Sequence, residues 1–321
     1  MLAVQVQRTG GPEVLEVVDL PEPKPGPGEI LIAQEAVGLN FIDTYHRGGL
    51  YPMKLPMVLG TEGAGVVEAV GEGVTRFSPG DRVAYAGGFG AYAQKRTYPA
   101  DRAVKLPEGI STRLAAASIL KGMTAEFLLR RCYPVKPGDP ILVHAAAGGV
   151  GMILAQWGKA LGALVIGTAG SAEKAEIAKA HGCEDVILYR EEDVAQRVKT
   201  ITGGAGVRVV YDGVGADTFE ASLASLGRRG VLVTYGNASG PVPPVAPLKL
   251  MRGSLYLTRP TLFDYIASTR ELDESANALF HVLESGAVKV EIGQEFPLAE
   301  ARRAHEALEA RQTVGSTLLI P

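Results

Sequence analysis

A glycine-rich turn in the middle of the chain, AAAGGVG at Ala145–Gly151, has the composition of a phosphate-binding loop. Its residues carry almost no side chains, so backbone N–H groups at the start of a following helix can approach an anion directly. Only two glycines of the GxGxxG fingerprint hold their usual places, and an ordinary glycine turn in an α/β core is the alternative. We expect the pyrophosphate of a dinucleotide to contact the residues Ala147, Gly148, Gly149, Val150 and Gly151.

The segments on both sides of this turn satisfy the context that a dinucleotide motif requires. Ile141–Val143 is a short apolar run, as in a strand buried on both faces of a parallel sheet. A second apolar strand is predicted at Leu164–Ile166. Between them, spacings of three and four residues predict one apolar helix face, formed by Val150, Ile153, Leu154, Trp157 and Leu161.

The end of the second strand favours NADP over NAD. Folds that prefer NAD carry an acidic residue there, about 20 residues past the glycines, to bind the ribose 2′-hydroxyl. Here no carboxylate appears between Gly167 and Glu173, and a hydroxyl and a lysine stand nearby. Because a lysine binds phosphate as a point charge, these residues suit a 2′-phosphate, although Lys174 as an ordinary solvated lysine is the alternative. We expect NADPH to contact Thr168, Gly170, Ser171, Lys174 and Tyr189.

Composition restricts the remaining function classes. A chain of 321 residues with 46% hydrophobic content is long enough for two domains with a sizeable core. A net charge of −3 and no basic run longer than Arg228–Arg229 argue against a nucleic-acid partner. No apolar stretch reaches the roughly 20 residues that span a bilayer, and the N-terminus lacks a signal-peptide core, so we expect a cytoplasmic protein without a membrane partner. We expect Cys132 and Cys183 to be buried, unpaired thiols.

The predicted elements fall into two domains, one of them inserted into the other. Residues 1–120 are rich in short strands separated by proline and glycine turns, which indicates a compact barrel-like unit. Its strands are predicted at Ala3–Gln7, Ile30–Val37, Gly65–Val70, Arg82–Ala86 and Ala91–Val104. Residues 121–259 then alternate helices with apolar strands, as in a doubly wound parallel sheet. Its six strands are predicted at Ile141–Val143, Leu164–Ile166, Asp185–Leu188, Val207–Tyr211, Gly230–Tyr235 and Leu255–Leu257.

The tail, residues 260–321, is predicted to rejoin the first domain, which leaves the nucleotide domain inserted between two parts of the other. A long helix is expected at Tyr265–Gly286 and a second one at Leu298–Ala310. Short strands are expected at Val288–Glu291 and Ser316–Ile320.

This order of domains resembles the medium-chain dehydrogenase/reductase superfamily and, within it, the zinc-free quinone oxidoreductases of the zeta-crystallin group. The resemblance spans nearly the whole chain, and five segments carry it in the family's order. These are GLNFIDTYHRGGLYP at Gly38–Pro52, LGTEGAGVV at Leu59–Val67, AAAGGVG at Ala145–Gly151, VVYDGVG at Val209–Gly215 and GSLYLTRP at Gly253–Pro260. The fold that it implies is α/β, with a β-rich GroES-like barrel domain and an inserted Rossmann domain.

Two departures separate this chain from the zinc-using branch of that superfamily. The alcohol dehydrogenases of that branch have a cysteine and a histidine as zinc ligands at positions that correspond to Asn40 and Thr61, and neither residue present here is a competent zinc ligand. The lobe of four cysteines that holds a structural zinc is also missing, and the five histidines share no ligand spacing. We therefore expect no metal site.

The resemblance and the strand ends together indicate the remaining site residues. Asn40 and Tyr45 lie in the segment that lines the cofactor site in the family, where either could hold the nicotinamide or donate a hydrogen bond to the acceptor, and Tyr51 is expected to line the acceptor pocket. Thr124 resembles a family contact near the nicotinamide, and Arg311 resembles an arginine that reaches the 2′-phosphate. Further cofactor contacts are expected at Gly213, Gly236, Asn237 and Ser239, three of which follow the fifth strand at the carboxyl edge of the sheet. Glu62 is expected to be a structural ion-pair partner.

Without a Lewis acid, reduction of an electron-poor acceptor is easier than oxidation of an alcohol, because the developing oxyanion needs only a hydrogen-bond donor or a proton. We therefore expect an NADPH-dependent quinone reductase with direct hydride transfer. An NADPH-dependent alkenal or enone reductase is the alternative among enzymes, and an NADPH-binding structural or RNA-binding protein is the alternative from another class. The resemblance also implies a homodimer, paired through the sixth strand near Leu255.

Overall fold

The computed structural model describes residues 1–321 and divides the chain into two compact units. The first unit consists of Met1–Met123, Ile266–Glu284 and Val290–Pro321, and the second of Thr124–Tyr265 and Ser285–Lys289. The second unit is therefore inserted into the sequence of the first. No helix is both long enough and apolar enough to cross a membrane.

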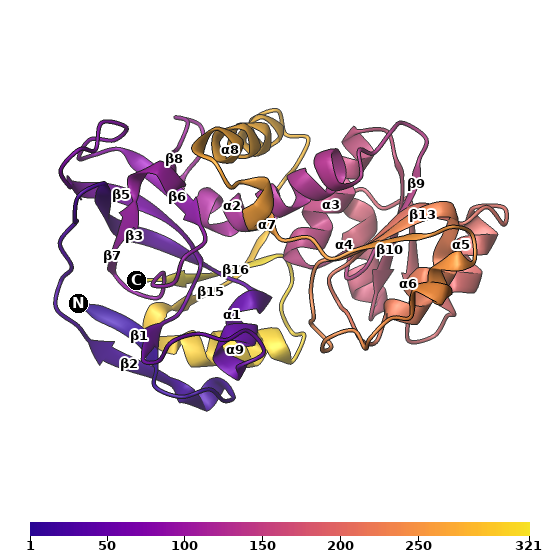
Figure 1. Ribbon diagram of the computed structural model, residues 1–321, viewed down its shortest axis with the longest axis horizontal. Coiled ribbons are helices and arrows are strands. Elements are labelled where there is room, and N and C mark those ends of the chain that lie inside the picture. The colour runs from indigo at the N-terminus through magenta and orange to yellow at the C-terminus, as the bar shows by residue number, and fades with distance from the viewer. The chain divides into compact units, whose positions relative to one another are not determined.

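The first unit is built from two antiparallel-rich sheets (Figure 1). The larger has the order β15-β16-β3-β5-β6-β8, with β7 also paired to β3, and the smaller has the order β2-β1-β4. The bounds of the strands are β1 Leu2–Val6, β2 Leu15–Asp19, β3 Glu29–Leu39, β4 Met57–Val58, β5 Glu62–Val70, β6 Arg82–Ala86, β7 Lys95–Pro99, β8 Ala103–Lys105, β15 Ile292–Pro297 and β16 Ser316–Ile320.

Four helices accompany these sheets, and the last strand of the chain pairs within the larger sheet. Strand β16 pairs with β3, for example Thr317 with Leu39, so the end of the chain joins the sheet of its beginning. The helices are α1 Phe41–Gly48, α2 Thr112–Phe127, whose last residues belong to the second unit, α8 Thr269–Glu284 and α9 Ala301–Glu309. Short single turns lie at η1 Pro12–Val14, η2 Ala100–Arg102 and η5 Leu298–Glu300. One core joins both ends of the chain, since Val4 and Tyr92 are buried in the same cluster as Leu298 and Leu319.

The second unit contains a six-stranded parallel sheet in the order β11-β10-β9-β12-β13-β14, the doubly wound arrangement that the sequence predicts. Its strands are β9 Pro140–Val143, β10 Leu164–Ala169, β11 Asp185–Leu188, β12 Val207–Asp212, β13 Leu226–Thr234 and β14 Tyr256–Thr258. Its helical elements are η3 Leu128–Cys132, a π-helical turn, α3 Gly149–Ala160, α4 Ala172–Ala180, α5 Val194–Ile201, α6 Phe219–Ser225, η4 Pro247–Met251 and α7 Leu262–Tyr265.

Both faces of this sheet are covered, which explains its almost continuous apolar strands. Leu142 of β9 packs in one core cluster with Val198 of α5 and Phe219 of α6. The neighbouring Ile141 faces α3 on the other side, where an added Cβ on Gly158 would be 3.0 Å from its Cδ1. Successive residues of one strand are therefore buried against different helices.

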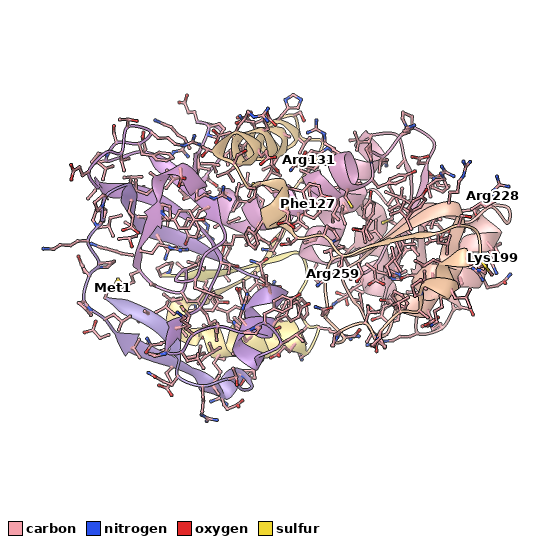
Figure 2. The ribbon with its side chains drawn as sticks, viewed as in Figure 1. Met1, Phe127, Arg131, Lys199, Arg228 and Arg259 are labelled. Carbon is pink, nitrogen blue, oxygen red and sulfur yellow. The ribbon has the colours of Figure 1, made fainter.

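The chain leaves the second unit at Tyr265, and two side chains of that unit contact this residue. They are Phe127 and Arg131, both labelled in Figure 2. The ring of Phe127 stacks on the ring of Tyr265 with centroids 4.4 Å apart. Arg131 donates to the Tyr265 carbonyl at 2.6 Å and pairs with the Glu126 carboxylate. The position where the chain crosses between units is thus fixed by stacking and by a charged donor.

Four sequence predictions need correction in these elements. The strand expected at Ala91–Val104 is broken into β7, η2 and β8, because Pro99 ends β7 and the two strands pair with different partners, β3 and β6. The strand expected at Val288–Glu291 is wrong: β15 begins at Ile292, whereas Lys289 bonds to the Gln156 side chain. The helix expected at Tyr265–Gly286 begins later, because α7 ends at Tyr265 and a capping box of Ser268 and Glu271 starts α8 at Thr269.

The helix expected at Leu298–Ala310 also begins later, because η5 occupies Leu298–Glu300 and α9 starts at Ala301. Of the two cysteines, Cys183 is buried as expected, but Cys132 is only partly buried because it lies at the end of η3. Both are free thiols.

Candidate functional site

The glycine turn of the second unit leads directly into helix α3. Gly148 is the N-cap in an extended conformation, and no side chain caps the helix. A Cβ on Gly151 would lie 2.2 Å from the Ala145 carbonyl oxygen and 2.9 Å from the Ala146 Cα, so only glycine permits this approach of helix and turn. An uncapped helix start with bare backbone suits an anion, because its N–H groups and the helix dipole both favour negative charge. These residues therefore fit the pyrophosphate of a dinucleotide.

A chain of buried hydrogen bonds holds the start of the glycine turn at Ala145. The Ala145 N–H donates to the Thr168 hydroxyl at 3.2 Å, and that hydroxyl lies 3.1 Å from His144 Nδ1. His144 Nε2 lies 2.9 Å from Ser222 Oγ, which donates to Asp212 at 2.7 Å. Because the Ser222 proton points to Asp212, His144 carries its proton on Nε2 and accepts on Nδ1. The Thr168 side chain, predicted to contact the cofactor, is thus buried and used to hold Ala145, a non-glycine residue with a φ of +52°.

The residues predicted for the 2′-phosphate lie together at the ends of β10 and β11. Ser171 is the N-cap of α4, and its hydroxyl accepts from the Lys174 backbone N–H at 3.3 Å. A Cβ on Gly170 would be 2.6 Å from the Tyr189 hydroxyl, so this phenol lies directly over the turn. That these residues bind a 2′-phosphate stays a prediction.

The turns after β12 and β13 are joined to each other. A Cβ on Gly236 would be 2.2 Å from the Gly213 carbonyl oxygen, so these two turns approach at backbone distance. The Ser239 hydroxyl donates to the Val214 carbonyl at 2.9 Å, and the Ala238 N–H donates to the Gly213 carbonyl at 3.3 Å. Asn237 lies in the sequence between Gly236 and Ala238, two residues that make these contacts. Except for Thr124 and for Thr168, which lies within β10, the predicted contact residues of the second unit thus follow carboxyl ends of strands or begin the helix behind them, where ligands bind in such sheets.

In the first unit, Asn40 stands at the start of α1 beside a buried ion pair. Its Nδ2 donates to Glu62 Oε2 at 2.7 Å and to the Gly38 carbonyl at 3.3 Å. Lys121 Nζ lies 2.7 Å from the same Glu62 oxygen, and both side chains are buried. The Leu120 N–H donates to the other oxygen at 2.7 Å. The expectation that Glu62 is an ion-pair partner is confirmed, and this arrangement fixes the amide of Asn40.

Tyr45 and Tyr51 belong to an aromatic cluster at the end of α1. Their rings meet edge to face with centroids 5.4 Å apart. The His46 ring lies 5.5 Å from Tyr51 and 4.6 Å from Phe89, and burial lowers the pKa of His46 so that it is neutral at pH 7. A half-buried set of flat rings and phenol groups of this kind suits a planar conjugated molecule.

A second buried carboxyl group of the first unit, that of Asp43, contacts both Asn40 and Thr61. Its Oδ2 accepts from the Asn40 N–H and from the Tyr92 hydroxyl, each at 3.0 Å, and its Oδ1 accepts from the Thr61 hydroxyl at 3.3 Å. Desolvation by complete burial raises the pKa of Asp43 to about 7, despite these three donors. The first unit therefore holds a carboxyl group that changes its protonation near neutral pH.

The other two predicted residues are Thr124 and Arg311. Thr124 is buried in α2 and belongs to the second unit, whereas Asn40, Tyr45 and Tyr51 belong to the first. Arg311 belongs to the first unit and is exposed directly after α9, with a φ of +58°.

The positions that hold zinc ligands in the zinc-using branch are occupied here by hydrogen-bonding side chains. Asn40 donates to Glu62, and Thr61 donates to Asp43. No group of three or more histidine, cysteine, aspartate or glutamate residues is arranged to hold a metal ion.

Sequence reasoning missed the buried residues that hold both sites. In the second unit these are His144 and Asp212, and in the first they are Asp43 and Lys121. His144 directly precedes the glycine turn, and Asp212 ends an apolar strand, so a polar residue at the carboxyl end of a buried strand was the available signal. No such signal was available for Lys121, because its partner Glu62 is 59 positions away in the chain.

Comparisons with known proteins agree with this architecture. Residues 26–108 match the alcohol dehydrogenase GroES-like domain family, and residues 149–281 match the zinc-binding dehydrogenase family. The quinone oxidoreductase of Salmonella typhimurium is 54% identical over 99% of both chains, and the 2-haloacrylate reductase of a Burkholderia species is 43% identical over 100% of this chain and 99% of that protein. The structure of Escherichia coli quinone oxidoreductase complexed with NADPH is 52% identical, covers 100% of both chains and has a TM-score of 0.98. The chain therefore belongs to the zinc-free quinone oxidoreductase family of the medium-chain dehydrogenases and reductases.

Proposed function

We propose that this chain is an NADPH-dependent quinone reductase that transfers hydride directly to its acceptor without a metal. The observation that carries the proposal is the pair of turns after β9 and β10. The first presents uncapped backbone at the start of α3, and the second has Ser171 and Lys174 where an NAD-preferring fold has an acid. Family membership and the relatives' names support the same reaction.

The second unit is proposed to bind the cofactor and the first, discontinuous unit to bind the acceptor. Gly148, Gly149, Val150 and Gly151 would hold the pyrophosphate through backbone N–H groups, with Ala147 beside them. The hydroxyl of Ser171, the ammonium of Lys174 and the phenol of Tyr189 would bind the 2′-phosphate, with Arg311 as a further cation. Thr124, Gly213, Gly236, Asn237 and Ser239 are proposed to contact the nicotinamide half.

NADPH supplies a hydride from C4 of its nicotinamide, and the chain's own residues must orient the acceptor and stabilise its developing charge. The amide of Asn40 is proposed to hold the nicotinamide through its Oδ1, because its Nδ2 already donates to Glu62 and to the Gly38 carbonyl. The rings of Tyr45 and Tyr51 are proposed to flank a flat acceptor, with a phenol as a hydrogen-bond donor to its oxygen. The buried Glu62–Lys121 pair would keep the Asn40 amide in one orientation during turnover.

The test is oxidation of NADPH and of NADH, followed by absorbance, with quinones, enals and simple alcohols as partners, each with and without a chelator. We expect NADPH-dependent reduction of quinones that the chelator does not change. Equal use of NADH would refute the 2′-phosphate site, and chelator-sensitive alcohol oxidation would refute metal-free hydride transfer.

A second candidate is reduction of a conjugated enone or acrylate, because the Burkholderia relative is named a 2-haloacrylate reductase. It needs the same cofactor site and a different acceptor pocket, so the ratio of kcat/KM for quinones to that for enals and acrylates decides between the two. An RNA-binding role would require salt-dependent retention on immobilised RNA, which the net charge of −3 argues against.

The assembly is proposed to be a homodimer that forms at the outer edge of the parallel sheet. Strand β14 is the last strand of that sheet, and three large apolar side chains near it are exposed: Leu248, Met251 and Tyr256. Sedimentation of the wild-type protein should give a dimer, and Met251→Glu with Tyr256→Glu should give a monomer. A cytoplasmic location is also proposed, since both cysteines are unpaired thiols.

A further inference from the structure

A chain of buried hydrogen bonds links Arg47, His305 and Tyr92 to Asp43, and its donors all face the same way. The Arg47 guanidinium contains only donors, so His305 Nδ1, 2.9 Å from it, accepts. His305 Nε2 therefore carries the proton and donates to the Tyr92 oxygen at 2.9 Å. The Tyr92 hydroxyl in turn donates to Asp43 Oδ2 at 3.0 Å. Every proton in this chain points toward the carboxylate.

This chain cannot supply a proton to Asp43, because its outer end is blocked. An arginine side chain does not lose its proton in a protein, and Arg47 also pairs with Glu309 at 2.6 Å. Burial and the Arg47 charge lower the pKa of His305 to about 3, so this imidazole stays neutral and keeps one tautomer. The Arg47–His305–Tyr92 chain is therefore a fixed support.

The opposite oxygen of Asp43 has a different partner. Oδ2 already accepts from the Asn40 N–H and the Tyr92 hydroxyl, which leaves Oδ1 as the oxygen that can carry a proton. The Thr61 hydroxyl is the hydrogen-bond partner of Oδ1, at 3.3 Å. A hydroxyl both accepts and donates, so Thr61 can take a proton from Asp43 and give its own proton away on its other side.

The charges around Asp43 oppose one another. Lys121 of α2 favours the carboxylate, and Glu62 of β5 favours the protonated form. Tyr92 and His305 face Asp43 from the segment before β7 and from α9, and both are neutral because burial raises the pKa of Tyr92 and lowers that of His305. Arg47 on α1 is neutralised by Glu309. Burial then keeps Asp43 partly protonated at neutral pH, with a pKa of about 7.

We propose that Asp43 and Thr61 form the proton-donating pair of the reaction, with the proton leaving through the Thr61 hydroxyl toward the reduced acceptor. The inference rests on the proposed function, in which hydride transfer leaves a negative charge on an acceptor oxygen. That oxygen takes the Thr61 proton, and the Thr61 oxygen takes the Asp43 proton. One O–H bond forms on the product, one breaks on Asp43, and the remaining carboxylate regains a proton from water after the product leaves. Asp43 acts through Thr61 and is a positioning and proton-storing residue.

The test compares the pH dependence of kcat in four variants with saturating NADPH and quinone. Wild-type kcat should fall about tenfold per pH unit above pH 7, as the protonated form of Asp43 is lost. Asp43→Asn keeps the shape of the side chain, and we expect kcat at pH 6 to fall on the order of 100-fold and its pH dependence to vanish. Thr61→Val should reproduce that loss, whereas Thr61→Ser should keep most of the activity. Asp101→Asn, at an exposed carboxylate of the same unit, should leave the profile unchanged, since Asp101 is no part of the network around Asp43.

The dissociation constant for NADPH, measured by titration calorimetry, should be the same in all five proteins, which separates loss of chemistry from loss of cofactor binding. Wild-type kcat and an unchanged pH profile in Asp43→Asn would overturn the inference, and so would equal kcat in Thr61→Val and Thr61→Ser. A wild-type protein that binds NADPH but reduces no quinone or enone would instead refute the proposed function.

Discussion

Asp43→Asn should stabilise the fold, and more strongly as the pH rises. Burial raises the pKa of Asp43 from an ordinary 3.8 to about 7, so between these values the folded chain holds a proton that the unfolded chain releases. The free energy of unfolding therefore falls as pH rises through that window. A pKa difference of about three units between the folded and the unfolded chain corresponds to about 4 kcal/mol of free energy of unfolding. Asparagine cannot ionise and avoids this cost.

The assay is urea unfolding of wild type and Asp43→Asn at pH 5 and pH 8. The difference in free energy of unfolding between the two proteins should grow in favour of the variant by a few kcal/mol from the lower to the higher pH. The exposed Asp101 in the same unit provides a control, since Asp101→Asn should show no such growth. A difference that does not change with pH, or one that favours wild type more at pH 8, would refute the buried, proton-storing carboxyl.

Three further outcomes test the cofactor turns and the buried ion pair. Gly151→Ala should weaken NADPH binding about tenfold or more in a calorimetric titration, since its Cβ would lie 2.2 Å from the Ala145 carbonyl oxygen, and unchanged affinity would contradict that geometry. Lys174→Ala should raise the KM for NADPH about tenfold and leave that for NADH unchanged, as expected for one point charge on a phosphate; parallel changes in both would argue against it. Lys121→Met should lower the free energy of unfolding by about 3–5 kcal/mol because it leaves the buried Glu62 carboxylate unpaired, and a neutral effect would show that Glu62 takes up a proton or finds another partner.

The sequence predicted best the features that depend on residues close together in the chain. The strand, turn and helix at Ile141–Ala160 follow from apolar runs and glycines within twenty positions, and the order of the six strands follows from the rules of parallel sheets. The bounds at Ala91–Val104 were wrong because the local sequence does not reveal that the two halves of this segment pair with different strands, β3 and β6.

The buried residues that support each site could not be predicted, for a reason other than that of the strand bounds. Asp43, Tyr92 and His305 are separated by 49 and 213 positions in the chain, so no local pattern connects them. Each alone resembles a common buried polar residue with a satisfied hydrogen bond. His144 and Thr168 are likewise brought together by neighbouring strands of the sheet. Such networks follow from tertiary packing, which periodicity and composition do not contain.

The two positions that distinguish this chain from the zinc-using branch gain their meaning from that packing. Asn40 and Thr61 were informative in the sequence because neither can bind zinc, and in the structure both contact Asp43. Asn40 contributes its backbone N–H to one oxygen, and Thr61 contributes its hydroxyl to the other. A carboxyl group whose burial disfavours its charge is costly to the fold, and such costs concentrate where a protein uses them. If Asp43 stores the proton that completes reduction, the residues in place of a Lewis acid are the ones that hold and release that proton.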